Sequence, residues 1–255
     1  MTPRILIIAG SDSGGGAGIQ ADIKTVTMLG GHAMTAITAI TAQNTLGVQA
    51  VLPVPAEMVI AQINSVVTDI GIDAVKIGMI GSASTARALG DVLEQFDVPI
   101  VFDPVMMATS GDVLADSETI TAFERLMGIA SLVTPNIPEL AALGGKEAVL
   151  AHGCHLLAKG GHAEGNWIVD ELFAPNGTRR HWEAKRLETG HTHGTGCTLA
   201  SAIATGLGDG LPLEDAVARA IRFVRIALLS APGLGQGNGP MGHALGVIPF
   251  DEIEG

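Results

Sequence analysis

The chain is poor in aromatic residues: tyrosine is absent, and aromatic residues make up 3% of the 255 positions. A planar ligand therefore has few rings to stack on and would need another group or an apolar pocket. Hydrophobic residues still account for 47% of the chain, enough for a large core. We expect one α/β domain over residues 1–255, without an internal boundary.

Cysteine is scarce as well. Cys154 and Cys197 are the two cysteines, and they have neither CxxC spacing nor a secretory signal beside them. This argues against a disulfide framework and against a cysteine zinc site. The apolar run from Arg4 to Ala9 is far too short to span a bilayer and predicts a buried first strand. A reducing cytoplasm is the expected location.

Basic residues are few: 14 lysines and arginines stand against 26 acidic residues, for a net charge of -12. This balance favours solubility and argues against a general basic surface that would bind nucleic acid or an anionic membrane. We expect neither as a partner, so any phosphate site has to be local.

A glycine-spaced turn, Thr192-His193-Gly194-Thr195-Gly196-Cys197-Thr198, opens directly into an Ala-rich stretch that predicts a helix. Backbone N–H groups that cannot pair inside the helix would point into one small space at its positive end. This predicts an anion site, with phosphate as the best candidate. The helix terminus is also expected to stabilise a thiolate, which would make Cys197 a stronger base or nucleophile than a buried cysteine.

A strand, a glycine loop and a helix follow one another at the N-terminus. Arg4 to Ala9 predicts the strand, Gly10 to Gly18 the loop, and Ile19 to Leu29 the helix. The loop lacks the GxxxxGK[ST] pattern and the spacing of a dinucleotide fingerprint. A tight turn without a ligand therefore stays open as an alternative.

Two side chains near strand ends are candidates to contact a planar ligand. Ala33 to Ala42 alternates like a half-buried strand and ends beside Gln43, whose amide could pair with a heteroaromatic edge. Ordinary turn chemistry is the alternative for Gln43. Met79 could pack against a flat ligand, or it could fill the core.

Two acidic residues and a lysine follow other predicted strands. Asp103 lies where open α/β sheets bind ligands, so it could hold magnesium, although an Asp-Pro turn is an alternative. Glu139, in the first turn of a helix opened by Pro138, could be an ordinary capping acid or could join Asp103 around a magnesium nucleotide. Lys159 precedes two glycines and could reach a transferred phosphoryl group, or it could simply be solvated.

Strands and helices alternate along most of the chain. This order predicts a largely parallel sheet with helices on both faces, and loops that gather at the carboxyl ends of the strands. Trp167 to Phe173 and Thr178 to Ala184 flank Pro175-Asn176-Gly177, which predicts a hairpin added to the main sheet. We expect a three-layer α/β/α domain with a mostly parallel central sheet and a small added β-hairpin.

Seven blocks, in family order over nearly the whole chain, closely resemble the hydroxymethylpyrimidine/phosphomethylpyrimidine kinases of thiamine biosynthesis, which belong to the ribokinase-like superfamily. The blocks are Gly10-Ser11-Asp12-Ser13-Gly14-Gly15-Gly16-Ala17-Gly18-Ile19-Gln20-Ala21-Asp22, Ala42-Gln43-Asn44-Thr45, Lys76-Ile77-Gly78-Met79, Asp103-Pro104-Val105-Met106, Thr134-Pro135-Asn136-Ile137-Pro138-Glu139, Lys159-Gly160-Gly161-His162 and the turn Thr192 to Thr198. Together they are far more specific than any one glycine motif.

The resemblance implies ATP-dependent phosphorylation of 4-amino-5-hydroxymethyl-2-methylpyrimidine and then of its monophosphate, in one site, with Mg²⁺ and in a homodimer. It also implies a role for each matching residue. Cys197 would activate the hydroxymethyl group, Gly194 and Gly196 would form part of the anion hole, and Lys159 would face the transferred phosphate. Gln43, Asp12, Asp22, Met79 and Gly10 would read, line or order the pyrimidine pocket; Asn136, Lys159 and Thr195 would bind the nucleotide; Asp103 and Glu139 would support the metal.

The sequence departs from the family pattern between Leu143 and Cys154, where Gly144-Gly145 leaves room for less helix than expected. Two alternative functions stay open. One is a pyridoxal or pyridoxine kinase of the same superfamily; the segment His193 to Cys197 favours the pyrimidine kinase over it. The other is a non-catalytic pyrimidine-binding sensor; the presence of Lys159, Glu139 and Cys197 together argues against it.

Overall fold

The computed structural model describes residues 1–162 and 165–245. Within them, nine strands form one sheet in the order β3-β2-β1-β4-β5-β6-β7-β8-β9. The predicted single domain over residues 1–255 includes 163–164 and 246–255, which lie outside the described part, and it stays a prediction.

The strands are β1 (Arg4–Asp12), β2 (His32–Asn44), β3 (Gly47–Pro53), β4 (Ala74–Ile77), β5 (Ile100–Phe102), β6 (Leu132–Val133), β7 (His155–Ala158), β8 (Trp167–Phe173) and β9 (Arg179–Lys185). The helices are α1 (Gly18–Met28), α2 (Ala56–Asp69), α3 (Ala83–Leu93), α4 (Ser117–Met127), α5 (Ile137–Ala142), α6 (Lys146–Leu150), α7 (Thr195–Gly208) and α8 (Leu213–Leu229), with a 3₁₀ turn at Gly160–His162.

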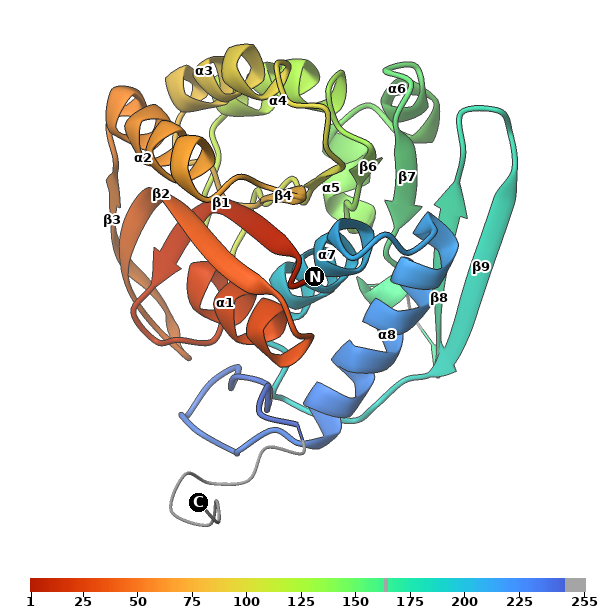
Figure 1. The fold of residues 1–255 in the computed structure, drawn as a ribbon. Helices are drawn as coiled ribbons and strands as arrows, with labels where there is room; N and C mark the ends of the chain where they lie inside the picture. Colours follow the sequence, from red (N-terminus) through yellow and green to blue (C-terminus); the bar gives the residue numbers. More distant parts are fainter. Residues whose placement is uncertain (163–164, 246–255) are drawn as a thin grey trace.

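The central strands are parallel, and helices cover both faces of the sheet (Figure 1). One apolar core joins the sheet to α2, α3, α4 and α6, and a second core joins it to α1, α7 and α8. The run Ile5–Ala9 of β1 is at most 1% exposed because both faces of the strand are covered. The expected three-layer arrangement is confirmed.

Parallel pairing brings the carboxyl ends of β1, β2, β4, β5, β6 and β7 to one edge of the sheet. The residues that follow these strands therefore converge there, and α7 begins at the same edge. This edge carries the candidate site.

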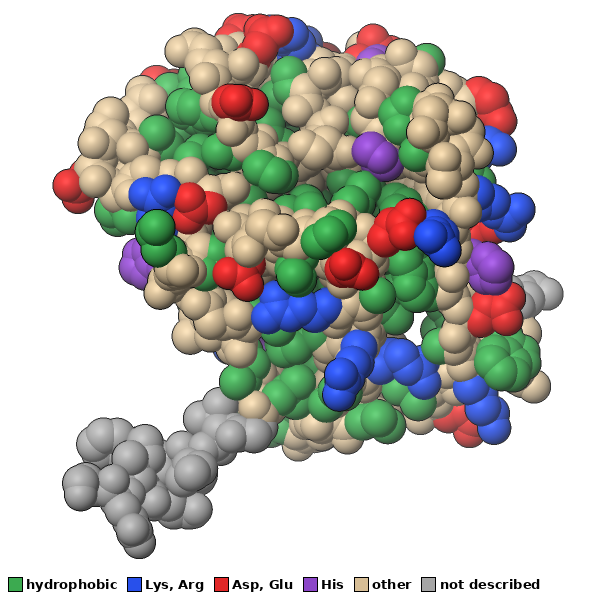
Figure 2. All heavy atoms as spheres, turned by 45° about the vertical axis from the view of Figure 1, so that its right-hand side comes forward, with side chains coloured by type: hydrophobic (Ala, Val, Ile, Leu, Met, Phe, Trp, Pro, Cys, Tyr) green, Lys and Arg blue, Asp and Glu red, His purple; other side chains and the backbone are tan. Residues whose placement is uncertain are grey.

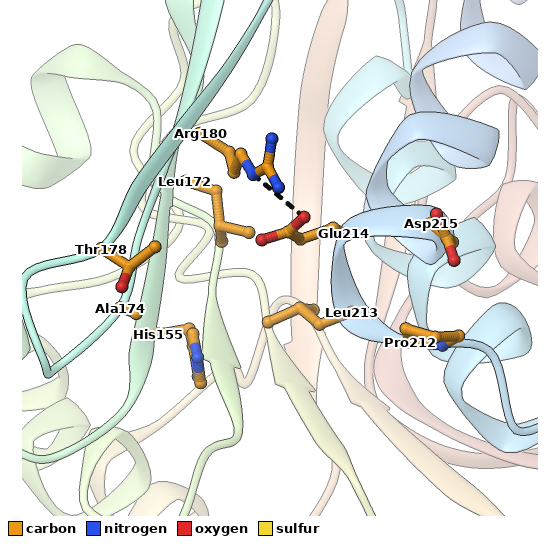
Figure 3. A pocket seen from close by; sticks show the side chains of 9 residues that line it. All are labelled: His155, Leu172, Ala174, Thr178, Arg180, Pro212, Leu213, Glu214 and Asp215. Carbon is orange, nitrogen blue, oxygen red and sulfur yellow. Dashed lines mark ion pairs between the residues drawn. The ribbon is translucent and has the colours of Figure 1, made fainter.

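The predicted hairpin is present: β8 pairs antiparallel with both β7 and β9. A crevice of about 320 Å³ separates it from the start of α8 (Figure 3). Arg180 of β9 and Glu214 of α8 form an ion pair of 3.1 Å across this crevice. His155, at the start of β7, lines it, whereas Lys159 lies past the other end of β7, so the crevice is remote from the candidate site.

The connection after β6 is as short as the sequence suggested. Helix α5 has six residues and α6 has five, and Gly144 and Gly145 between them adopt φ angles of +87° and +90°. A residue with a side chain is strained in that left-handed region, so the two glycines end α5 and start α6.

The described part of the chain contains no helix both long and apolar enough to cross a bilayer. On the face seen in Figure 2, basic and acidic side chains lie interspersed rather than sorted by sign.

We predict that Phe123→Ala lowers the free energy of unfolding by about 3–5 kcal/mol. Phe123 is 1% exposed and meets Phe102 edge to face, with ring centroids 5.2 Å apart, so truncation leaves a cavity between α4 and β5. Urea unfolding followed by circular dichroism measures the change. As a control, Leu229→Ala, at a side chain 72% exposed, should stay within about 0.5 kcal/mol of the wild type. Equal losses in both variants would contradict this packing.

Candidate active site

The first turn of α7 lies against the N-terminal glycine loop. Gly194, the N-cap residue, has a φ of +86°, and a Cβ there would lie 2.0 Å from the carbonyl oxygen of Gly16. Thr195 donates its N–H to Thr192, 3.3 Å away. By helix geometry the N–H groups of Gly196 and Cys197 have no partner within the helix. The approach of Gly194 to Gly16 therefore requires glycine, and the anion hole expected at this turn stays a prediction.

A lysine and two carboxylates lie beside this turn. Lys159 Nζ is 2.7 Å from Asp103 Oδ1 and 4.0 Å from Glu139 Oε2. A Cβ on Gly196 would lie 3.3 Å from that Nζ and 3.4 Å from Asp103 Oδ2. Burial opposes the charge on Lys159, but Asp103 and Glu139 outweigh it and raise the lysine pKa. A fixed cation therefore lies beside the first turn of α7, and the solvated alternative for Lys159 is wrong.

Asn136 and Glu139 form a capping box at the start of α5. Asn136 Oδ1 accepts the N–H of Glu139, and Glu139 Oε2 accepts the N–H of Asn136, each at 2.8 Å. The ordinary capping role left open for Glu139 is confirmed. Burial raises the pKa of Glu139, although the nearby Lys159 opposes the shift. Capping does not remove Glu139 from the site, because its carboxylate still lies beside that lysine.

Asp12 ties the two glycine loops together. Its carboxylate accepts the N–H groups of Gly14, Gly16 and Ala17 at 2.7–2.9 Å, and it lies 2.9 Å from His193 Nε2. Burial opposes ionisation of Asp12, but the imidazole and the backbone N–H groups outweigh it and lower its pKa. With these contacts the carboxylate fixes the loop from Gly14 to Ala17 against His193.

The predicted pyrimidine-reading residues lie next to this tie. Gln43 Oε1 accepts the hydroxyl of Thr41 at 3.1 Å, which leaves its amide nitrogen 3.4 Å from His193 Nε2. Met79 is 8% exposed, and its sulfur lies 2.9 Å from the position that a Cβ on Gly10 would take. Gly10 therefore makes room for the side chain of Met79.

Asp22 is fully buried in α1, where it accepts from Lys76 at 2.8 Å and from Ser201 at 2.7 Å. Asp22 is expected to line or order the pyrimidine pocket; because helix α7 covers its carboxylate, its position fits the ordering role, which stays a prediction.

The thiolate expected at Cys197 is not favoured by its surroundings, and its role in activating the acceptor stays a prediction. Burial raises the pKa of the thiol to about 11, with Lys76 opposing the shift and Asp22 and Asp103 adding to it. The helix terminus favours a thiolate, as the sequence suggested, but the loss of solvent and the two carboxylates outweigh that effect. The resting group is a thiol.

Three residues of the site were missed by the sequence argument. His193 lies within the glycine turn and could have been found as its one titratable residue besides the thiol. Lys76 could have been noticed as a charge in an otherwise apolar strand. Thr45 accepts the N–H groups of Gln236 and Gly237 at 3.2 and 3.3 Å, and no sequence signal linked these distant segments.

The arrangement combines a glycine turn at the start of a helix, a lysine fixed beside two carboxylates, and the amide of Gln43 next to His193. Among the residues that the structure describes, no three His, Cys, Asp or Glu side chains are grouped as a complete metal cage. Magnesium usually binds one or two carboxylates together with substrate phosphates and water, so Asp103 and Glu139 fit a nucleotide-borne ion. These parts suit phosphoryl transfer.

We predict that Asp12→Asn lowers the free energy of unfolding at pH 7 by about 1–3 kcal/mol, because an amide cannot replace both acceptor oxygens. The folded pKa of Asp12 is lowered, so its stabilisation is complete above the unfolded value of about 3.9 and disappears as pH falls through the folded value. Urea unfolding at several pH values should show the two proteins converging in acid. A difference in unfolding free energy that stays constant across pH would contradict the stabilising role of the Asp12 carboxylate. Asp91→Asn, at a side chain that is 77% exposed, serves as the control.

Comparisons with known proteins agree with this geometry. A sequence profile described as phosphomethylpyrimidine kinase matches residues 12–242. The chain is 46% identical over 260 residues to a hydroxymethylpyrimidine/phosphomethylpyrimidine kinase of Rhizobium meliloti, covering 95% of this chain and 97% of the relative.

Two solved structures extend the comparison. A phosphomethylpyrimidine kinase of Clostridium difficile is 36% identical with a TM-score of 0.76, covering 89% of this chain and 99% of that one. An ADP complex of Bacillus subtilis pyridoxal kinase is 30% identical with a TM-score of 0.87, covering 96% and 98%.

The family and the ribokinase-like α/β fold inferred from the seven blocks are thereby confirmed, as is the predicted phosphotransferase. The profile spans every predicted site residue except Gly10. The chain belongs to the phosphomethylpyrimidine kinase family, the kinases of thiamine biosynthesis.

Proposed function

We propose that the protein transfers the γ-phosphoryl group of ATP to the hydroxymethyl oxygen of 4-amino-5-hydroxymethyl-2-methylpyrimidine, and then a second group to the resulting monophosphate. The observation that carries this proposal is the position of the first turn of α7. It contacts the glycine loop of the pocket through Gly194, and Lys159 and Asp103 through Gly196. One turn of helix can therefore bind the transferred group between acceptor and donor.

In the proposed reaction the acceptor oxygen forms a bond to the γ-phosphorus while the bond from that phosphorus to the bridging oxygen of ADP breaks. The charge spreads over the oxygens of the transferred group, which the N–H groups of Gly196 and Cys197 and the Nζ of Lys159 can neutralise. Asp103 and Glu139 would hold the magnesium ion that ATP brings, directly or through water. The ion would offset phosphate charge.

Cys197 is proposed to act as a base in its ionised form: the thiol first releases its own proton to solvent, and the thiolate then takes the hydroxymethyl proton as the new bond forms. With a pKa of about 11, the thiol predominates at pH 7, so the thiolate is a minor, reactive form. A loose transition state needs little deprotonation beforehand. The monophosphate attacks through an oxygen that is already ionised, so the second step has no proton for Cys197 to accept.

We predict that Cys197→Ala folds and loses most turnover with the hydroxymethylpyrimidine, by about 10²- to 10⁴-fold, while turnover of the monophosphate falls much less. Steady-state ADP release with each acceptor measures the two losses. Cys154→Ala, at a buried cysteine remote from the site, is the matched control and should keep both activities. Wild-type activity of Cys197→Ala, or equal losses with both acceptors, would remove the base assignment.

The second candidate is a pyridoxal kinase. It is favoured by the TM-score of 0.87 to the Bacillus subtilis pyridoxal kinase, which exceeds the 0.76 to the Clostridium difficile enzyme. Both acceptors carry a hydroxymethyl group on a small heteroaromatic ring, so the reaction centre alone does not separate them.

We predict that the purified protein, supplied with magnesium ATP, releases ADP when the hydroxymethylpyrimidine or its monophosphate is added. The kcat/KM for pyridoxal or pyridoxine should be at least about tenfold lower. Preference for the pyridoxal acceptors would reverse the assignment. Binding of the pyrimidine without ADP release would instead favour the sensor. The homodimer, the cytoplasmic location and the single domain stay predictions.

A further inference from the structure

Helices α1 and α7 lie side by side. Gly194, at the start of α7, packs against the carbonyl of Gly16, just before α1. Further along both helices, Ser201 donates to Asp22 Oδ1 at 2.7 Å. Residues four apart share a helix face, so Cys197 lies on the same face of α7 as Ser201. The thiol therefore lies near a buried carboxylate.

A buried lysine completes this arrangement. Lys76 of β4 is fully buried, and its Nζ lies 2.8 Å from Asp22 Oδ2, which is also fully buried. Gly78 gives the ammonium its space, since a Cβ there would lie 2.7 Å from Nζ. A buried ion pair is a weak source of stability because both charges lose their hydration. Stability alone therefore does not explain this one.

The charged groups that act on Cys197 come from four elements of the fold. Lys76 of β4 favours a negative sulfur, whereas Asp22 of α1 and Asp103 after β5 disfavour it. Lys159, after β7, is in turn stabilised as a cation by a negative Cys197. Asp22 keeps Lys76 protonated despite its burial, since the carboxylate and its neighbours raise the pKa of that lysine.

We propose that Asp22, Lys76 and Ser201 are positioning residues for Cys197. Ser201 and Asp22 fix the first turns of α7 and α1 against each other, and the ammonium of Lys76 supplies the positive charge that supports the sulfur when it loses its proton. The role in turnover rests on the proposed function of Cys197. The effect on the thiol does not, because it exists in the resting protein.

The test is the rate of alkylation of Cys197 by iodoacetamide across the alkaline range, in a Cys154→Ala background and without substrate. In Lys76→Met, the rate at a given pH should fall about tenfold, the change that one pH unit in the thiol midpoint produces. The double variant Asp22→Asn with Lys76→Met removes both charges, so it leaves no unpaired buried charge and keeps the test available if the single variant does not fold. Its alkylation should also be slower than in the wild type, and its kcat with the hydroxymethylpyrimidine should fall at least tenfold with KM values within about threefold.

Thr205→Val is the matched control. Thr205 is equally buried on the next turn of α7, but its hydroxyl donates to the backbone oxygen of Ser201 at 2.7 Å rather than to a charged group among the described residues. It should leave the alkylation profile and kcat unchanged. A folded double variant with a wild-type alkylation profile would overturn the proposal, as would an equal slowing in Thr205→Val. The wild type could show the expected alkylation profile and still phosphorylate no pyrimidine. The proposed function would then be wrong, but the proposed effect of Lys76 and Asp22 on the Cys197 thiol would still stand.

Discussion

The site depends on the contact between two stretches of backbone that carry no side chains. Gly194 approaches the carbonyl of Gly16 so closely that a methyl group at Gly194 would overlap it. This contact places the start of α7 over the carboxyl edge of the sheet, where Lys159 and Asp103 arrive on parallel strands. Moving the turn outward by the width of a methyl group would separate the expected anion hole from the lysine.

Around this turn, buried charges are arranged in pairs rather than left alone. Lys159 is paired with Asp103, Lys76 with Asp22, and Asp12 with His193 and three backbone N–H groups. Each carboxylate orders a segment of chain near the place where a phosphoryl group would pass. In a protein of net charge -12, this local pairing also keeps two lysines, Lys76 and Lys159, buried as cations.

Much of the fold could be predicted because it follows from local patterns. The alternation of apolar strands with helices predicts a parallel sheet, and Asn176-Gly177 predicts the hairpin between β8 and β9. The capping pattern Asn136 to Glu139 likewise has a local cause, and it appears as a capping box. The chemical state of Cys197 could not be predicted, because it depends on Asp22, Lys76 and Asp103, which lie far from it in sequence.

The sequence by itself determined which groups are present and which backbone conformations they can adopt: a glycine turn before a helix, a lysine before two glycines, and carboxylates at strand ends. Only the tertiary structure decided which of them meet and what charge they carry. It made Asp22 a buried partner of Lys76, and it left Cys197 a thiol. The physical reason is that desolvation and charge pairing depend on what surrounds a group in space, and residues distant in the chain provide those surroundings.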